Sequence, residues 1–206
     1  MISIYQIFMS TGGALTLVGI FLTWNLSRKI EGFFLGYKKL SWCILLGGIL
    51  TSLGFIVTML EVHEGIISIA ILLGPILIAY SLSESELVKP TWTMLLQIVL
   101  IVLSTIFVEN KEFYMVELVS SFSLILLINA IVGYVRTPEN YKNLAKIASW
   151  MFVGFIWLNN LQPTRAIAPV IYVLSVVTWS YTLVRLHYVA VARFSNLKEG
   201  FPYRDE

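Results

Sequence analysis

Seven long apolar segments, separated by short polar ones, constrain this chain more than any other feature. Each is close to the roughly 20 residues that a helix needs to cross the hydrocarbon core of a bilayer. None shows the alternation of apolar and polar residues that is typical of a membrane β-strand, so all are expected to be helices. The expected spans are residues 3–26, 40–60, 66–83, 91–108, 113–135, 145–161 and 168–188.

The composition excludes an ordinary soluble domain. Hydrophobic residues make up 58% of the 206 residues and charged residues 13%, and the mean hydropathy is +0.83, all typical of a polytopic membrane protein. We expect one all-α domain over residues 1–206, a seven-transmembrane-helix bundle with 189–206 as a short cytosolic tail. The first apolar segment lacks the basic start and cleavage site of a signal peptide, which indicates a retained span.

The basic residues predict an orientation. Lys and Arg concentrate in the cytosolic loops of membrane proteins. With the N-terminus outside and the C-terminus in the cytosol, twelve of the 14 basic residues are cytosolic, and only Lys111 and Arg165 are outside. The cytosolic set is Arg28, Lys29, Lys38, Lys39, Lys89, Arg136, Lys142, Lys146, Arg185, Arg193, Lys198 and Arg204.

Small residues follow one side of each of the first two expected spans. Such stripes let helix backbones approach closely in lipid. Packing between neighbouring spans of the same chain is the favoured interpretation, and a dimer interface is the alternative. The stripes are Gly12, Thr16, Gly19 and Thr23 in the first span, and Gly47, Thr51 and Gly54 in the second.

The sixth and seventh expected spans carry the clearest candidate for a ligand site. Trp150 and Trp157 are seven residues apart and share a helix face, while Trp179 lies near the middle of the returning span. Aromatic residues at this spacing also pack helices together, and packing is the alternative. An apolar or amphipathic ligand would lie between the three tryptophans. The candidate ligand-binding residues are Glu117, Trp150, Trp157, Asn160, Tyr172, Ser175 and Trp179.

The sequence offers little for catalysis or for metal binding. His63 is expected in an outer loop and His187 near the inner end of the last span, roughly 30 Å apart, so the two cannot bind one haem or one metal ion. No aspartate precedes Asp205, which removes the Asp-rich motifs of Mg²⁺-dependent chemistry. A G-x-S-x-G motif is absent. We therefore expect no enzyme, no cofactor and no metal site.

In order and spacing, the chain resembles the microbial rhodopsins. Lys38-Lys39 enter the second span, and Gly74-Pro75 stand in the third span where that family commonly has a Thr-Pro pair. Trp150 and Trp157 have the separation of the tryptophan pair in the family's sixth helix. The resemblance covers most of the chain loosely and implies a seven-helix bundle with an aromatic-walled cavity.

The departures from that family concern its chemistry. The retinal-binding lysine of the last helix is replaced by Trp179 or a near neighbour. No lysine lies in the interior of an expected span, since Lys146 stands at the cytosolic end of the sixth. The third span has no carboxylate between Glu64 and Glu84, and Ser175 stands near the usual acid of the last helix. A protonated Schiff base with its counterion is therefore excluded, and with it light-driven pumping.

These features predict a non-enzymatic protein of the receptor or sensor type, which binds a small apolar or amphipathic ligand and acts through a membrane or cytosolic protein partner. A small-solute or ion transporter is one alternative, with Glu117, Asn129, Asn160 and Arg185 along its path. An accessory subunit of a larger membrane complex is the other. The chain is expected to be a multi-pass protein of the cell membrane, in contact with the lipid bilayer and without a nucleic-acid partner.

Overall fold

The computed structural model describes residues 4–29, 38–60, 65–84, 88–108, 111–134 and 137–200, and within these ranges it is all-helical. Ser3, His63, Glu64, Val135 and the tail residues 201–206 lie outside the described residues. The described part contains seven α-helices and two short 3-10 helices. They are α1 (Ile4–Lys29), α2 (Lys38–Leu60), α3 (Gly65–Ser83), α4 (Trp92–Leu103), η1 (Ser104–Phe107), α5 (Lys111–Gly133), α6 (Glu139–Asn160), η2 (Gln162–Thr164) and α7 (Ala168–Gly200). The predicted all-α class is confirmed.

Three helices of the described part are long and apolar enough to cross a membrane. Their apolar segments are Ile4–Leu26 in α1, Met115–Gly133 in α5 and Ala168–Val189 in α7. Shorter apolar helical segments cover Trp42–Gly54, Leu72–Ser83 and Trp92–Phe107. The described helices therefore include three candidate membrane spans within the seven segments that the sequence predicted.

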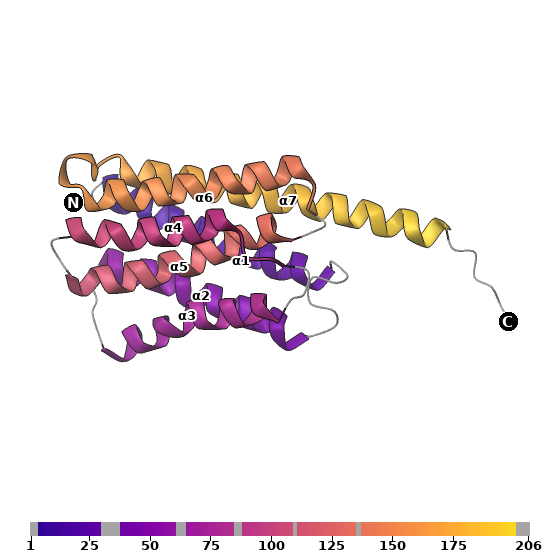
Figure 1. Ribbon diagram of the computed structural model, residues 1–206, viewed down its shortest axis with the longest axis horizontal. Helices are drawn as coiled ribbons and strands as arrows, with labels where there is room; N and C mark the ends of the chain where they lie inside the picture. Colours follow the sequence, from indigo (N-terminus) through magenta and orange to yellow (C-terminus); the bar gives the residue numbers. More distant parts are fainter. Residues whose placement is uncertain are drawn as a thin grey trace.

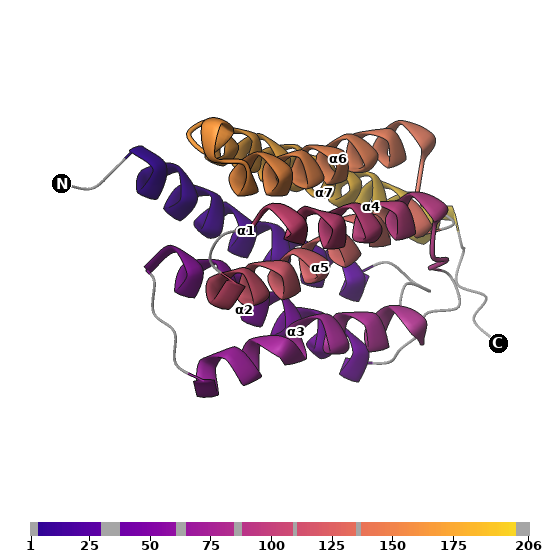
Figure 2. The same cartoon turned by 60° about the vertical axis from the view of Figure 1, so that its left-hand side comes forward.

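Helix α5 forms the centre of the bundle (Figures 1 and 2). It packs against α2, α3, α4 and α6, while α7 packs between α1 and α6 on the other side. Accordingly, 78% of the apolar segment of α5 is buried inside the protein, against 39% for α1 and 44% for α7. Helix α5 is therefore covered by other helices around most of its circumference.

Helices α6 and α7 differ most from the expected ranges. Helix α6 begins at Glu139, after Pro138, although its apolar part was expected from residue 145. Proline suits this position because its fixed φ matches the entry into a helix. Helix α7 continues to Gly200, through residues that were expected to form a tail, and extends beyond the other helices (Figure 1).

The small residues of α1 pack against the large aromatic residues of α7. A Cβ atom at Gly12 would overlap the ring of Tyr172, and one at Gly19 would lie 2.5 Å from the ring of Trp179. On α2, a Cβ atom at Gly47 would lie 2.7 Å from the carbonyl oxygen of Gly74 on α3. The prediction that the stripes pack neighbouring helices of the same chain is confirmed.

Candidate functional site

A chain of hydrogen bonds joins three helices around a buried carboxylate at the end of the bundle where α1 and α7 begin. Asn159 on α6 donates from Nδ2 to Oε1 of Glu117 on α5, at 2.9 Å. The hydroxyl of Tyr5 on α1 donates to Oδ1 of Asn159, also at 2.9 Å. Glu117 is only 6% exposed, so Asn159 is the polar group that fixes its carboxylate. We call Tyr5, Glu117, Asn159 and Arg165 the outer cluster.

Arg165 completes the outer cluster from the turn between α6 and α7. Its guanidinium carbon lies 5.5 Å from the centre of the Tyr5 ring, a cation–π distance. The turn is shaped by η2, in which Thr164 donates to the carbonyl oxygens of Leu158 and Leu161 at 3.0 and 3.1 Å. Arg165 is exposed, so a positive charge lies beside Tyr5 at the surface of this end of the bundle.

Asn160 and Trp157 belong to a neighbouring contact, between α6 and the end of α4. Asn160 donates from Nδ2 to Oγ of Ser104 at 3.2 Å. The ring of Trp157 lies 5.6 Å from that of Phe107, centre to centre. These two contacts hold η1 against α6, so both candidate ligand residues also have a packing role here.

A second polar cluster lies deeper in the bundle, between α4, α5 and α6. Gln97 donates from Nε2 to Oγ of Ser149 at 2.9 Å, and Asn129 donates from Nδ2 to Oε1 of Gln97 at 2.9 Å. Gln97, Asn129 and Ser149 are all buried. We call these three residues the inner cluster. Asn129 is twelve residues from Glu117, or about 18 Å along α5 at 1.5 Å per residue.

An aromatic layer separates the outer and inner clusters on the α6–α7 side. Tyr172 stacks on Phe155 with ring centres 4.8 Å apart and approaches Phe152 at 6.1 Å. All three side chains are fully buried. The Tyr172 and Thr16 hydroxyls lie 2.7 Å apart. Ser175, one turn along α7, donates to the carbonyl oxygen of Ala148 at 2.7 Å.

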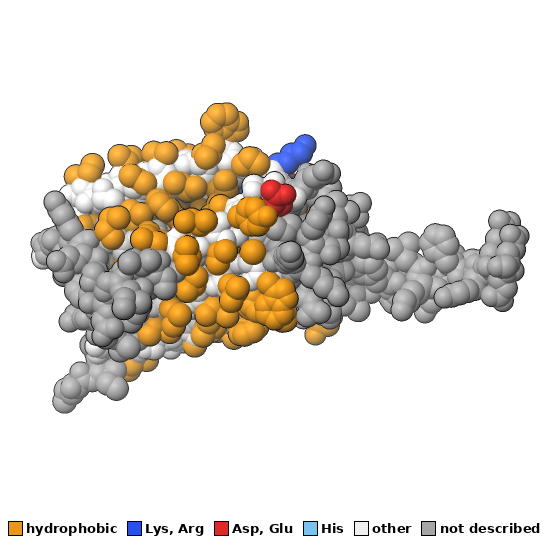
Figure 3. Space-filling view, turned by 90° about the horizontal axis from the view of Figure 1, so that it is seen from below, with side chains coloured by type: hydrophobic (Ala, Val, Ile, Leu, Met, Phe, Trp, Pro, Cys, Tyr) orange, Lys and Arg blue, Asp and Glu red, His pale blue; other side chains and the backbone are white. Residues whose placement is uncertain are grey.

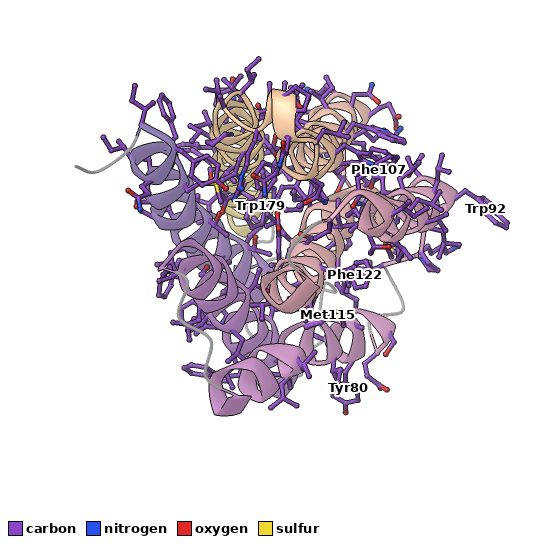
Figure 4. All side chains as sticks on the ribbon, turned by 90° about the vertical axis from the view of Figure 1, so that its left-hand side faces the viewer. Tyr80, Trp92, Phe107, Met115, Phe122 and Trp179 are labelled. Carbon is purple, nitrogen blue, oxygen red and sulfur yellow. The ribbon has the colours of Figure 1, made fainter. Side chains whose placement is uncertain are left out.

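The structure does not bring the three expected tryptophans together, which corrects the predicted aromatic wall. Trp179 is fully buried inside the bundle beside α1 (Figure 4). Trp150 is 39% exposed, and Trp157 lies against Phe107 at the side of α4. The reason is the helix face: α6 buries Ser149, Phe152, Val153, Phe155 and Ile156, and Trp150 falls outside that stripe.

The four residues expected along a transport path do not lie together either. Glu117 belongs to the outer cluster and Asn129 to the inner cluster. Asn160 bonds to η1, and Arg185 is exposed near the far end of the bundle. These four side chains therefore occupy four separate environments.

Sequence reasoning missed several residues of these clusters. A usable signal existed for α6, where Ser149, Phe152, Ile156 and Asn159 recur every three or four residues and so share one face. The tryptophans drew attention to the adjacent face. For residues on distant helices no such signal exists in one sequence. The missed residues are Tyr5, Thr16, Gln97, Ser149, Phe152, Phe155 and Asn159.

Among the described residues, no group of three or more His, Cys, Asp and Glu side chains is arranged to hold a metal ion. The outer cluster has a single carboxylate, Glu117, and its other members are an amide, a phenol and a guanidinium. Such a set can donate and accept hydrogen bonds and carries groups able to bear charge of either sign.

Comparisons with known proteins find no matching family model, no similar curated protein and no similar solved structure. The resemblance to the microbial rhodopsins stays a prediction. In the structure, Gly74 lies inside α3 against Gly47, and Trp179, near the place of the retinal lysine, packs on Gly19. The function must therefore be argued from the chain's own residues.

Proposed function

We propose that this chain is a seven-helix receptor or sensor of the cell membrane, with its N-terminus outside and its C-terminus in the cytosol. The distribution of basic residues supports this orientation. Lys29 ends α1, Lys38 begins α2, and Lys89, Lys142 and Arg185 lie near the same end of the bundle. Of the basic residues in the described part, only Lys111 and Arg165 belong to the opposite end, and the positive-inside rule assigns the end with the excess of basic residues to the cytosol.

The outer cluster is the proposed recognition site. The observation that carries the proposal is the hydrogen-bonded row Tyr5–Asn159–Glu117, which joins α1, α6 and α5 around a buried carboxylate. Ionisable groups inside a membrane span are expensive and mark functional sites by default. The ligand is a small amphipathic molecule whose head group donates hydrogen bonds to Glu117 or Asn159 and whose apolar part lies along the helices.

Helix α7 is the proposed output element. It begins three residues after Arg165, carries Tyr172 and Trp179 against α1, and continues as one helix to Gly200. Its 33 residues correspond to about 50 Å at 1.5 Å per residue, longer than the roughly 30 Å hydrocarbon core. A shift of α1 at the recognition site would therefore reach a membrane or cytosolic protein partner on the inner side.

The same residues argue against the transporter alternative. A path for a polar solute needs polar groups through the whole membrane. Here the outer and inner clusters are about 18 Å apart along α5, and the buried side chains between them on α6 are Phe152, Val153, Phe155 and Ile156. The packing favours a receptor with two local polar clusters over a continuous solute path.

The test is ligand-dependent stabilisation of the full chain in lipid nanodiscs. Amphiphiles of equal chain length, with an amine, an alcohol or a carboxylate head, are added while thermal unfolding is followed by tryptophan fluorescence. We expect the amine and the alcohol to raise the melting temperature and the carboxylate to have no effect. The Glu117→Gln variant should lose most of the amine effect.

Glu139→Gln is the matched control, because Glu139 is an exposed carboxylate at the other end of the bundle. It should respond to the amphiphiles as the unaltered chain does. If the amine stabilised Glu117→Gln as much as the unaltered chain, the proposal that the outer cluster is the recognition site would be wrong. Solute flux through proteoliposomes that is lost in Glu117→Gln would favour the transporter.

A further inference from the structure

Helices α3 and α4 leave one strip of the central helix only partly covered. Both pack against α5, with little contact between each other. From Met115 to Tyr134 the side chains are buried except four, which recur every three or four residues: Met115, Leu118, Phe122 and Leu126. Figure 4 shows Met115 and Phe122 pointing into the space between α3 and α4. We call this strip, with α3 and α4 on its two sides, the α3–α4 groove.

The connection between α3 and α4 closes the inner end of the groove. Its Lys89 backbone N–H donates to the carbonyl oxygen of Gly133 at 3.0 Å, and Val88 forms an isolated β-bridge with Tyr134. The connection therefore crosses the end of α5. Near this end the side chains of Glu84 and Lys89 are exposed, and Trp92, three residues after Lys89, is 87% exposed.

This face of the molecule is apolar except at that end. Figure 3 shows hydrophobic side chains over most of the described part of the face, with acidic and basic side chains at one edge. Within the described part of the chain, the ion pair found is Lys146–Glu139 on α6, so Glu84 and Lys89 do not neutralise each other by direct contact. The pair offers one positive and one negative charge to a ligand.

We infer that the α3–α4 groove binds a phosphatidylethanolamine molecule of the inner leaflet. Lys89 would bind the phosphate and Glu84 the ammonium group, so the two protein charges complement the two charges of the head group. Trp92 suits the interface between head groups and hydrocarbon. One acyl chain would lie on Leu126 and Phe122, since Phe122 is eleven residues from Gly133, or about 16 Å along α5. The inference rests on the membrane orientation proposed above.

The competing phospholipids make the inference testable. Phosphatidylcholine carries a quaternary ammonium that cannot donate a hydrogen bond to Glu84, and phosphatidylglycerol carries no cation. Native mass spectrometry of the full chain in mild detergent, with each lipid of equal acyl composition added in turn, measures retention directly. We expect phosphatidylethanolamine to be retained at least about threefold better than the other two, which corresponds to about 0.65 kcal/mol.

Two variants separate the head-group contact from the groove. The double variant Glu84→Gln/Lys89→Gln should abolish the preference while leaving weak binding of all three lipids. Leu126→Trp, which fills the groove, should reduce retention of all three. Glu139→Gln/Lys146→Gln removes a charged pair on α6 and should leave the preference intact.

Equal retention of the three lipids by the unaltered chain would overturn the inference, as would a preference that survives Glu84→Gln/Lys89→Gln. A stable dimer mass that is lost in Leu126→Trp would assign the groove to a second copy instead. Resistance of the chain to carbonate extraction from membranes is measured in parallel. Extraction by carbonate would refute membrane insertion itself, whereas an amphiphile test that fails in inserted protein would refute only the recognition site.

Discussion

The hydroxyl groups of Tyr172 and Thr16 lie 2.7 Å apart and connect α7 to α1 inside the bundle. Thr16 also donates to the carbonyl oxygen of Gly12, one turn earlier on α1, at 2.8 Å. The Tyr172 ring lies directly over Gly12. One glycine, one threonine and one tyrosine thus fix the distance and the register between the first and last helices.

Removing the tyrosine hydroxyl and filling the glycine position should have different costs. Tyr172→Phe loses one hydrogen bond, worth about 0.6 kcal/mol on average between membrane helices. Gly12→Val places a side chain where the Tyr172 ring lies, and overpacking costs about 1–3 kcal/mol. Unfolding in mixed SDS micelles, followed by tryptophan fluorescence, measures both. Gly13→Val is the control, since nothing lies within 4 Å of a Cβ atom there. A loss in Gly13→Val equal to that in Gly12→Val would contradict the assigned contact.

Trp179 and Gly19 should be energetically coupled. A Cβ atom at Gly19 would lie 2.5 Å from the Trp179 ring, so Gly19→Leu should destabilise the bundle by about 1–3 kcal/mol. Trp179→Ala alone should cost about 3–5 kcal/mol, because it leaves a cavity. In the double variant the leucine occupies part of that cavity.

The same unfolding assay, run on all four proteins of this cycle, tests the coupling. We expect the double variant to lose less stability than the two single variants together, by at least about 0.5 kcal/mol. Purely additive losses would mean that the two residues do not share one contact.

Asn159 should matter more for stability than its neighbour Asn160. Asn159→Leu leaves the buried Glu117 carboxylate and the Tyr5 hydroxyl without their partner, and hydrogen bonds to charged groups are worth about 1.5–3 kcal/mol. Asn160→Leu removes one bond to Ser104, worth about 0.6 kcal/mol. SDS unfolding compares the two variants. Glu117→Leu/Asn159→Leu should recover part of the loss, since both polar partners are then gone. Equal losses in the two single variants would contradict the network.

The helical class was predictable because the sequence consists largely of long apolar runs. Long apolar runs admit only helices when the backbone must satisfy its own hydrogen bonds. The packing role of the small-residue stripes was also predictable, because glycines such as Gly12 and Gly19 allow another helix to approach closely, whichever helix it is. The identity of the partner, Tyr172 or Trp179, depends on the order of helices around the bundle, which one sequence does not encode locally.

The composition of the candidate site was harder to predict than its region. Glu117 could be identified because it is a carboxylate within a long apolar segment. Its partner Asn159 is one of two adjacent asparagines. Neighbouring residues on a helix point about 100° apart, so the choice between the two asparagines depends on how α6 is rotated about its axis. The two tryptophans predicted a ligand-facing side of α6 that includes Trp150, whereas the structure buries Ser149 and Phe152 and leaves Trp150 partly exposed.

The three side chains of the inner cluster should depend on one another for stability. Gln97 bridges Asn129 and Ser149, so Gln97→Leu leaves two buried polar groups with fewer partners. Each unsatisfied group costs about 1–3 kcal/mol. Asn129→Leu removes the donor to Gln97 and should be costly for the same reason. Gln97→Leu/Asn129→Leu replaces both polar groups by apolar ones and should therefore cost less than the two single changes together, by about 0.5 kcal/mol or more.

SDS unfolding of the four proteins measures this coupling. Gln97→Leu combined with Thr11→Val is the matched control, because Thr11 is exposed on α1 and bonds to its own helix at Ile7. These two changes should be additive. If the Gln97 and Asn129 changes were equally additive, the three side chains would contribute as separate hydrogen bonds. The inner cluster would then hold α4 to the bundle only through its individual contacts, and the loss of one residue would leave the others unaffected.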